Sequence, residues 1–201
     1  IYSTSMNNIS GIILAGGKAR RMGGEDKGLT RLQGKPMVQH VIERLTPQLS
    51  TLVISANRNQ ERYQQYGYPV VADGDEQFQG PLAGIASGIQ ATDTPLVLVS
   101  PCDTPLLPTN LVSRLYNLLQ QSDSPIAVAH DGERLQQLCF LAKRSILDSI
   151  TEQLEQEQRR VQQWINSLNP VICTFDQPIA FSNINTPEEQ QRIAQQLEEN
   201  R

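Results

Sequence analysis

Short apolar runs alternate along the chain with stretches in which apolar residues recur every three or four positions. Strands of a sheet that is covered on both faces have continuous apolar runs, because neither face of the strand meets water. Four such runs are predicted as strands, at residues 12–15, 51–56, 69–72 and 95–100. Helical patterns lie between them, and this alternation is typical of a parallel sheet.

The first helical pattern follows Pro36, a residue type suited to the first position of a helix. Its apolar side chains form one stripe of a helix with 3.6 residues per turn, namely Met37, Val38, Val41, Ile42 and Leu45. Three further helices are predicted at residues 58–66, 81–91 and 108–121. The second of these begins with a proline and is rich in small residues, which permit close backbone packing.

The second half of the chain begins with a different pattern. Residues 126–131 and 134–142 are predicted strands on either side of an Asp-Gly turn, which joins them as a hairpin. One strand of the sheet is therefore expected to be antiparallel to its neighbour.

The remaining elements complete the predicted fold. Residues 143–168 hold one long or two short helices, and residues 171–175 form another strand. A capping box at residues 186–189 opens a final helix that reaches about residue 199. This order predicts a Rossmann-like, doubly wound α/β fold of three αβα layers around a mostly parallel, mixed sheet. In such folds the ligands lie beyond the carboxyl ends of the strands.

The composition agrees with one domain over residues 1–201. The chain has 201 residues, of which 38% are apolar and 19% charged, enough to build a sizeable core. Residues 1–5 precede the first methionine and are interpreted as an extension. The net charge of -4 argues against a nucleic-acid or membrane partner, since both need a broad basic field. An anionic ligand must therefore be held locally.

Location and cysteine chemistry follow from the same sequence. No run approaches 18 apolar residues and no secretory signal pattern occurs, so we expect a cytoplasmic protein.

Cys102, Cys139 and Cys173 are more than 30 residues apart, which fits neither a zinc site nor a disulfide framework. We expect three reduced, mostly buried thiols.

A glycine-rich basic loop follows the first predicted strand. Seven of the 13 glycines lie within residues 11–34, and Lys18, Arg20, Arg21 and Lys27 face only two acids there. Glycines allow backbone N–H groups to approach an anion, and the cations neutralise its charge. The loop therefore predicts phosphate binding. Its spacing matches neither a Walker loop nor a dinucleotide-binding fingerprint.

The loop at residues 14–27 resembles the signature of nucleotidyltransferases with the nucleotide-diphospho-sugar transferase fold. Within that superfamily the chain looks most like the molybdenum cofactor guanylyltransferases. The resemblance extends over nearly the whole chain, through residues 34–36, 55–58, 80–84, 101–105, 130–134 and 183–187. It implies that the N-terminal half binds the nucleotide and the C-terminal half the acceptor.

The resemblance also implies a reaction and its partners. GMP would pass from GTP to the terminal phosphate of molybdenum-bound molybdopterin, with release of pyrophosphate. A monomer would dock transiently with molybdenum-insertion proteins and molybdoenzymes. The acceptor phosphate is largely ionised at neutral pH, so no side chain need remove a proton. Repulsion between the polyanions must instead be overcome by a divalent cation, basic side chains and alignment.

Asp103 is the candidate metal ligand. It follows the strand predicted at residues 95–100, where such a sheet presents ligands, and lies between two prolines. The resemblance assigns Mg²⁺ to the same position. Lys27 and Arg21 are the candidates for catalytic phosphate contacts, with Lys18 and Arg20 as supporting charge or as solvated side chains.

By resemblance, the GTP site contains Leu14, Ala15, Gly16, Gly17, Lys27, Ser55, Asp73 and Asp103. Guanine presents adjacent N–H donors, which suit a carboxylate such as that of Asp73 or a row of backbone carbonyls. Asp73 could equally cap the turn after its strand. Ser55 stands where we expect asparagine in the family, and Asn57 could take over that role.

The acceptor is expected near Asn183 and Asn185, whose side chains share one side of an extended segment. These amides could bind the pterin, as the resemblance implies, or cap the final helix. Arg134, Arg159 and Arg160 are candidate partners of the acceptor phosphate. After Arg134 the chain has Leu-Gln-Gln where we expect a His-Pro pair in relatives.

Two other functions remain open from the residues alone. One is transfer of a nucleotide to a sugar phosphate or an alcohol phosphate, which CTP or UTP preference would favour. The other is a non-catalytic nucleotide-binding or cofactor-carrier protein. A nucleophilic role of Cys102 is rejected, because a small apolar residue at a strand end is ordinary and no histidine is near in sequence.

Overall fold

A seven-stranded mixed sheet organises the computed structural model, which describes residues 8–15, 26–73, 80–184 and 186–199. The strand order is β5-β4-β1-β6-β8-β7-β9. The strands are β1 (Ile9–Leu14), β4 (Thr51–Ser55), β5 (Val70–Val71), β6 (Leu96–Pro101), β7 (Ile126–His130), β8 (Leu135–Lys143) and β9 (Val171–Thr174). Only β8 runs against its neighbours β6 and β7, as the predicted hairpin requires.

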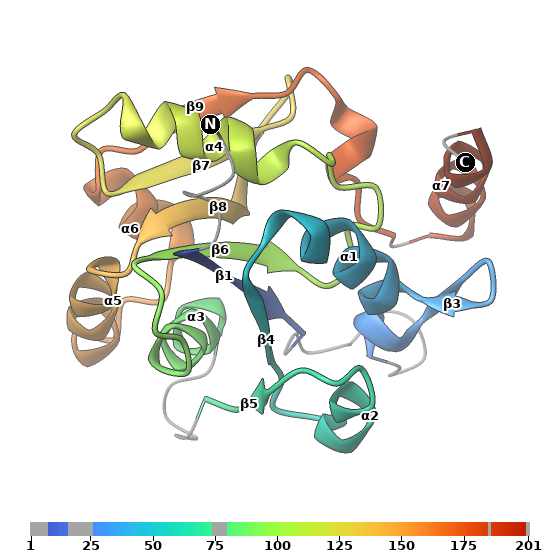
Figure 1. Ribbon diagram of the computed structural model, residues 1–201, viewed down its shortest axis with the longest axis horizontal. Coiled ribbons are helices and arrows are strands. Elements are labelled where there is room, and N and C mark those ends of the chain that lie inside the picture. Colours follow the sequence, from blue (N-terminus) through green and yellow to red (C-terminus); the bar gives the residue numbers. More distant parts are fainter. Residues whose placement is uncertain (1–7, 16–25, 74–79, 185, 200–201) are drawn as a thin grey trace.

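Helices cover both faces of this sheet and give three layers (Figure 1). One face packs against α1 (Met37–Leu45), α2 (Gln60–Gln64) and α4 (Leu111–Gln120). The other face packs against α3 (Pro81–Gln90), α5 (Ile146–Glu155) and α6 (Val161–Ser167). Neighbouring strand residues alternate between the two cores, so that Ile12 belongs to one and Ile13 to the other. The predicted fold class is confirmed.

Helix α3 lies close to the sheet because its sequence contains small residues at the contact. A Cβ added to Gly88 would lie 2.5 Å from Cγ2 of Ile12, so no larger residue fits there without movement. The predicted helix at 81–91 therefore has a packing reason for its glycines. This contact holds the helix against β1, the strand that lies between β4 and β6.

A third, smaller core joins the C-terminal helix α7 (Pro187–Glu199) to a short hairpin, β2 (Arg31–Leu32) and β3 (Lys35–Pro36) (Figure 1). Leu32 and Ile193 are both buried in it. The capping box predicted at the start of α7 forms: the Thr186 hydroxyl accepts from the Glu189 N–H at 3.2 Å, and the Glu189 carboxylate accepts from the Thr186 N–H at 3.1 Å.

Several predicted boundaries were wrong, for local reasons. The helix predicted at 58–66 begins only at Gln60, because Asn59 has a left-handed backbone with φ of 54°. The strand predicted at 69–72 shrinks to β5, and β1 begins at Ile9 rather than at residue 12. The β2–β3 hairpin was missed, and its turn has positive φ at both Gln33 and Gly34. Among the described residues, no helix is long and apolar enough to cross a membrane.

Trp164 fixes the α5–α6 pair to the sheet. Its ring is fully buried, lies edge-on to Phe140 at 5.8 Å between centroids, and donates from Nε1 to the Ser149 hydroxyl at 3.0 Å. We expect Trp164→Ala to lower the free energy of unfolding by about 3–5 kcal/mol through loss of packing. Ser149→Ala leaves the ring packed, removes the hydrogen bonds of the Ser149 hydroxyl with Trp164 and with the Ile146 carbonyl, and should cost about 1 kcal/mol.

Urea unfolding followed by circular dichroism measures both values. Equal costs for the two variants would contradict a packing role of the ring.

Candidate functional site

Three parallel strands end side by side and define the candidate site. Leu14, the last residue of β1, pairs with Ser55 of β4 on one side and with Pro101 of β6 on the other. Beyond the strands the ladder continues: the Ala15 N–H donates to the Ser55 carbonyl at 2.8 Å, and the Cys102 N–H donates to the Leu14 carbonyl at 3.2 Å. The loops that follow these strands therefore start from one edge of the sheet.

Lys27 and Asp103, which are 76 residues apart in sequence, meet at this edge. The Lys27 Nζ lies 3.5 Å from the Asp103 Oδ2, longer than the 2.7–2.9 Å typical of a strong ammonium–carboxylate bond. Asp103 is 6% exposed, whereas the Lys27 side chain is 38% exposed. The lysine thus touches a buried carboxylate and also reaches solvent, where a phosphate group could approach it.

Burial governs the acid–base state of Asp103. Its removal from water raises the pKa of the carboxyl above the ordinary value, and the Lys27 ammonium opposes that change by favouring the charged form. A second cation beside Asp103 would favour the carboxylate further. A cationic ligand would therefore stabilise the charged form of this carboxyl.

The residues around Asp103 fit a hard divalent cation. Carboxylate and hydroxyl oxygens suit Mg²⁺, which is commonly held by one or two carboxylates with phosphate oxygens and water completing the shell. The neighbouring Thr104 hydroxyl is buried and has no hydrogen-bond partner within the described part of the chain. No group of three or more metal-ligating acids, histidines or cysteines occurs among those residues either, so a cation there would need ligand oxygens from the substrate.

Ser55 and Leu14 lie against helix α3. A Cβ on Gly84 would be 2.8 Å from the Ser55 Oγ and 3.5 Å from the Leu14 Cδ2. Ser55 is 4% exposed, so its hydroxyl is enclosed by this helix. A short side chain at position 55 is compatible with that close packing.

Asn57 connects the ends of β4 and β5. Its side-chain oxygen accepts a hydrogen bond from the Asp73 N–H at 3.0 Å. Burial raises the pKa of the Asp73 carboxyl, while a hydrogen bond from its own backbone N–H lowers it. The contact puts Asn57 beside Asp73, which is the arrangement needed if Asn57 compensates for the serine at position 55.

Several predicted residues lie outside the described ranges. They are the loop residues Gly16, Gly17, Lys18, Arg20 and Arg21 and the acceptor residue Asn185. Their assigned roles remain predictions. Asn183 is described and is exposed, next to the buried Ile184, while the start of α7 is capped by Thr186 and Glu189.

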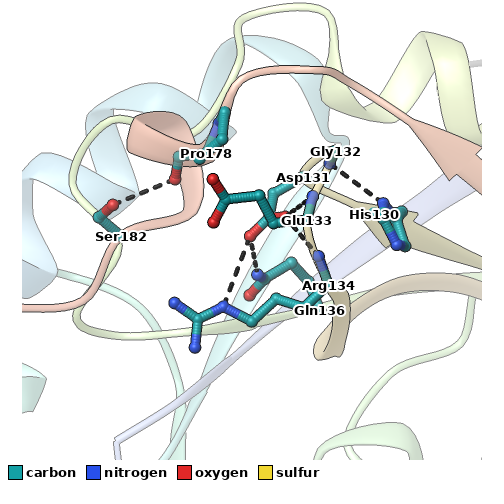
Figure 2. A network of polar contacts seen from close by, with 8 residues as sticks. All are labelled: His130, Asp131, Gly132, Glu133, Arg134, Gln136, Pro178 and Ser182. Carbon is teal, nitrogen blue, oxygen red and sulfur yellow. Dashed lines mark hydrogen bonds and ion pairs between the residues drawn. The ribbon is translucent and has the colours of Figure 1, made fainter.

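The turn between β7 and β8 is built around Asp131 (Figure 2). Asp131 is 2% exposed, and its Oδ1 accepts from the backbone N–H groups of Glu133 and Arg134 at 2.8 Å each. Its Oδ2 accepts from the Gln136 amide at 2.6 Å and lies 3.8 Å from the Arg134 Nε. The unexpected Gln136 therefore has a role in this chain, because it supplies a donor to a buried carboxylate.

The predicted phosphate-binding arginines stand on two different loops. Arg134 is in the turn just described, and its side chain is 81% exposed. Arg159 and Arg160 are exposed residues between α5 and α6. The cysteines, in contrast, are all buried, and burial raises the pKa of the Cys102 thiol well above its usual range.

Sequence reasoning missed the part played by Asp26, which it counted only as an acid opposing the loop cations. The structure buries Asp26 next to Tyr63 and makes it the cap of η2 (Lys27–Leu29), a 3₁₀ turn. An acid two residues before Gly28 was the available signal, since such residues cap turns.

The lysine and the buried aspartate lie at the carboxyl ends of parallel strands, where doubly wound α/β proteins bind their ligands. The MobA-like NTP transferase domain matches residues 11–171. The molybdenum cofactor guanylyltransferase of Shewanella baltica strain OS155 is 47% identical over 192 residues, 95% of this chain and 98% of that protein. The protein of the same name from Shewanella sp. strain MR-4 is 47% identical over 190 residues, 94% of this chain and 96% of that protein.

Solved structures share the fold at lower identity. Molybdopterin-guanine dinucleotide biosynthesis protein A from Archaeoglobus fulgidus has a TM-score of 0.78 at 22% identity, covering 94% of this chain and 99% of that one. CMP:2-keto-3-deoxy-manno-octonic acid synthetase has a TM-score of 0.72 at 12% identity, covering 96% of this chain and 100% of that one. With the sequence matches, the chain belongs to the molybdenum cofactor guanylyltransferases, a family of MobA-like NTP transferases, and is a nucleotidyltransferase.

Lys27 gives a kinetic prediction. If its ammonium stabilises charge that develops on the phosphates, Lys27→Ala should lower kcat by roughly 10²-fold to 10³-fold, as loss of one preorganised donor does. Lys143→Ala is the matched control, because Lys143 pairs with Leu96 at the opposite edge of the sheet. Pyrophosphate release measures both. A Lys27→Ala rate equal to that of the control would remove Lys27 from the chemistry.

Asp131 gives a prediction about the pH dependence of stability. Burial alone would raise the pKa of this carboxyl, but hydrogen bonds from the Arg134 and Glu133 N–H groups and from Gln136 outweigh it and hold the pKa below the ordinary 3.8. The charged form therefore stabilises the fold above that pH, and the stabilisation is lost as the pH falls through the lowered pKa.

Asp131→Asn should consequently cost about 1–3 kcal/mol of unfolding free energy at pH 7, and the difference from the wild type should shrink below pH 3.8. Urea unfolding over this pH range measures it, with the exposed Asp123→Asn as control. A pH-independent difference would contradict the linkage.

Proposed function

We propose that this protein transfers GMP from GTP to the terminal phosphate of molybdopterin, forming molybdopterin guanine dinucleotide and pyrophosphate. The observation that carries the proposal is the meeting of Lys27 with the buried Asp103 at the edge where β1, β4 and β6 end. The family supplies the identity of the substrates, and the geometry supplies a place for their phosphates. The molybdenum-bound form of the pterin is the proposed acceptor.

In this reaction an oxygen of the acceptor phosphate forms a bond to the α-phosphorus of GTP, and the bond from that phosphorus to the bridging oxygen of the β-phosphate breaks. The electron pair leaves with pyrophosphate. The acceptor is already ionised near neutral pH, because the second pKa of a phosphate monoester is about 6. No general base is needed, in agreement with a described edge that presents a lysine and an aspartate.

The protein's own residues would act by position and charge. Lys27 would neutralise phosphate oxygens, with Arg21 as the second cation proposed from the sequence. Asp103, with the neighbouring Thr104 hydroxyl, would hold Mg²⁺, which when bound supplies charge neutralisation for the phosphates. Leu14, Ala15 and Ser55 would line the nucleotide end of the edge.

Base recognition is proposed for Asp73. A carboxylate matches the adjacent N1–H and N2–H₂ donors of guanine. The hydrogen bond from the Asp73 N–H to Asn57 fixes the Asp73 backbone, which favours one direction of approach for the base. Gly16 and Gly17 would contribute backbone N–H groups to the phosphates, as the sequence predicts.

Acceptor binding is proposed for the C-terminal half of one domain that spans the chain. Asn183 and Asn185 would contact the pterin, and the exposed arginines would attract its phosphate. The protein is proposed to be a cytoplasmic monomer. It would exchange substrate and product with molybdenum-insertion proteins and molybdoenzymes, which pass the cofactor on. These parts of the proposal rest on family resemblance.

The direct test is an assay with each of the four nucleoside triphosphates, Mg²⁺ and molybdopterin. Release of pyrophosphate and formation of the dinucleotide, followed by mass spectrometry, should occur with GTP alone. Turnover with CTP or UTP and a sugar phosphate or alcohol phosphate would instead favour the broader nucleotidyltransferase class. Tight GTP binding without any turnover would support a carrier protein and contradict the proposal.

A metal-ligand role predicts a large effect at Asp103. Asp103→Ala should retain the fold but lose at least about 10²-fold in kcat at saturating Mg²⁺, since several kcal/mol of charge stabilisation would be removed. The exposed Asp148→Ala on α5 serves as the control. Near-normal turnover of the Asp103 variant, with its circular dichroism spectrum unchanged, would remove Asp103 from the mechanism.

A further inference from the structure

A buried carboxylate lies directly before the proposed phosphate-binding lysine. Asp26 is 8% exposed, and its Oδ1 accepts from the Tyr63 hydroxyl at 2.7 Å and from the Gly28 N–H at 3.3 Å. Its Oδ2 accepts from the Asn59 side-chain amide at 3.3 Å. Gly28 belongs to η2, whereas Asn59 is the N-cap of α2 and Tyr63 lies within α2, so the acid joins two parts of the chain.

The chemistry of Tyr63 makes it a lasting donor to this acid. Its side chain is fully buried, and burial, with the neighbouring Cys102 and Asp26, raises the pKa of the hydroxyl far above its usual range. Tyr63 therefore keeps its proton at any working pH. A buried carboxylate that lost this donor would be left partly unsatisfied, which is costly.

The backbone around Asp26 is held at the same time. Its carbonyl accepts from the Leu29 N–H at 2.9 Å and from the Thr30 N–H at 3.2 Å, which closes the turn that contains Lys27. Asp26 thus binds the turn twice, through its side chain at Gly28 and through its carbonyl at Leu29 and Thr30.

The turn that contains Lys27 also packs closely against the side chains of Tyr63 and Cys102. A Cβ on Gly28 would lie 2.6 Å from the Tyr63 hydroxyl oxygen and 3.1 Å from the Cys102 Sγ, so the glycine backbone fills the space between these two side chains. Cys102 directly precedes Asp103. The turn of Lys27 is therefore packed on the same loop that presents the proposed metal ligand.

We propose that Tyr63 and Asp26 are positioning residues that fix the Lys27 ammonium for its action on the phosphates. Neither needs to touch the substrate. Asp26 caps the turn that contains Lys27, and Tyr63, a residue of α2, fixes the Asp26 side chain through a hydrogen bond. The inference rests on the proposed function, in which Lys27 acts on the transferred nucleotide.

The role predicts a specific kinetic signature. Tyr63→Phe keeps the ring in the core and removes only the hydroxyl that binds Asp26. If Lys27 acts mainly in the transition state, the variant should lose about tenfold in kcat, the effect of one hydrogen bond to a charged group, with the KM for GTP changed by less than about twofold. A residue that only stabilises the fold would change the melting temperature and leave kcat of the folded enzyme intact.

Tyr66→Phe is the matched control. Tyr66 lies three residues further along, is half-buried, and contacts the same side of the sheet. Its hydroxyl is not among the donors to Asp26. This variant should keep the wild-type kcat.

A double-mutant cycle with Lys27→Ala separates the positioning role from independent effects. When Lys27 is absent, Tyr63→Phe should have no further effect on kcat, measured as pyrophosphate release at saturating GTP and molybdopterin. If Tyr63→Phe lowers kcat equally with and without Lys27, or lowers it no more than Tyr66→Phe does, the positioning role is wrong. If Lys27→Ala alone leaves kcat unchanged, the role proposed for Lys27 itself has failed, and the positioning proposal fails with it.

Discussion

The site depends on the parallel pairing of β1 with both β4 and β6. Because Leu14 pairs with Ser55 and with Pro101, three chain segments from different parts of the sequence end at one edge. The apolar strands are covered on both faces, so their register is fixed by burial as well as by hydrogen bonds. Lys27, Ser55 and Asp103, which are proposed to meet the nucleotide, lie at this edge.

Two buried acids give the edge its electrostatic character. Asp103 has the Lys27 ammonium as its charged neighbour, while Asp26 is stabilised by neutral donors from Tyr63, Asn59 and Gly28. The two carboxylates therefore have different tasks. The first gains from a cation, and the second is satisfied within the protein and holds the turn of Lys27.

The sequence predicted the layers, the mixed sheet and the hairpin well, because continuous apolar runs, helical stripes and an Asp-Gly turn are local signals. It also predicted that Lys27 and Asp103 belong together, through family resemblance. It did not predict the network of Asp26 and Tyr63 or the donor role of Gln136. The Gln136–Asp131 contact is local, but it depends on the shape of the turn between β7 and β8. Asp26 and Tyr63 are far apart in sequence, and only the packing of the helices and turns on the sheet brings them together. The short β2–β3 hairpin was missed for a similar reason, since its strands are stabilised by the small core shared with α7.

In the proposed function, the edge formed by β1, β4 and β6 holds the triphosphate and its metal between Lys27 and Asp103. The most direct measurement is a crystal structure of the protein with GTP and Mn²⁺, in which anomalous scattering locates the metal. The account predicts a Mn²⁺ peak within about 2–2.5 Å of an Asp103 carboxylate oxygen, with phosphate oxygens beside the Lys27 Nζ. A fully occupied triphosphate and metal away from both residues would contradict it.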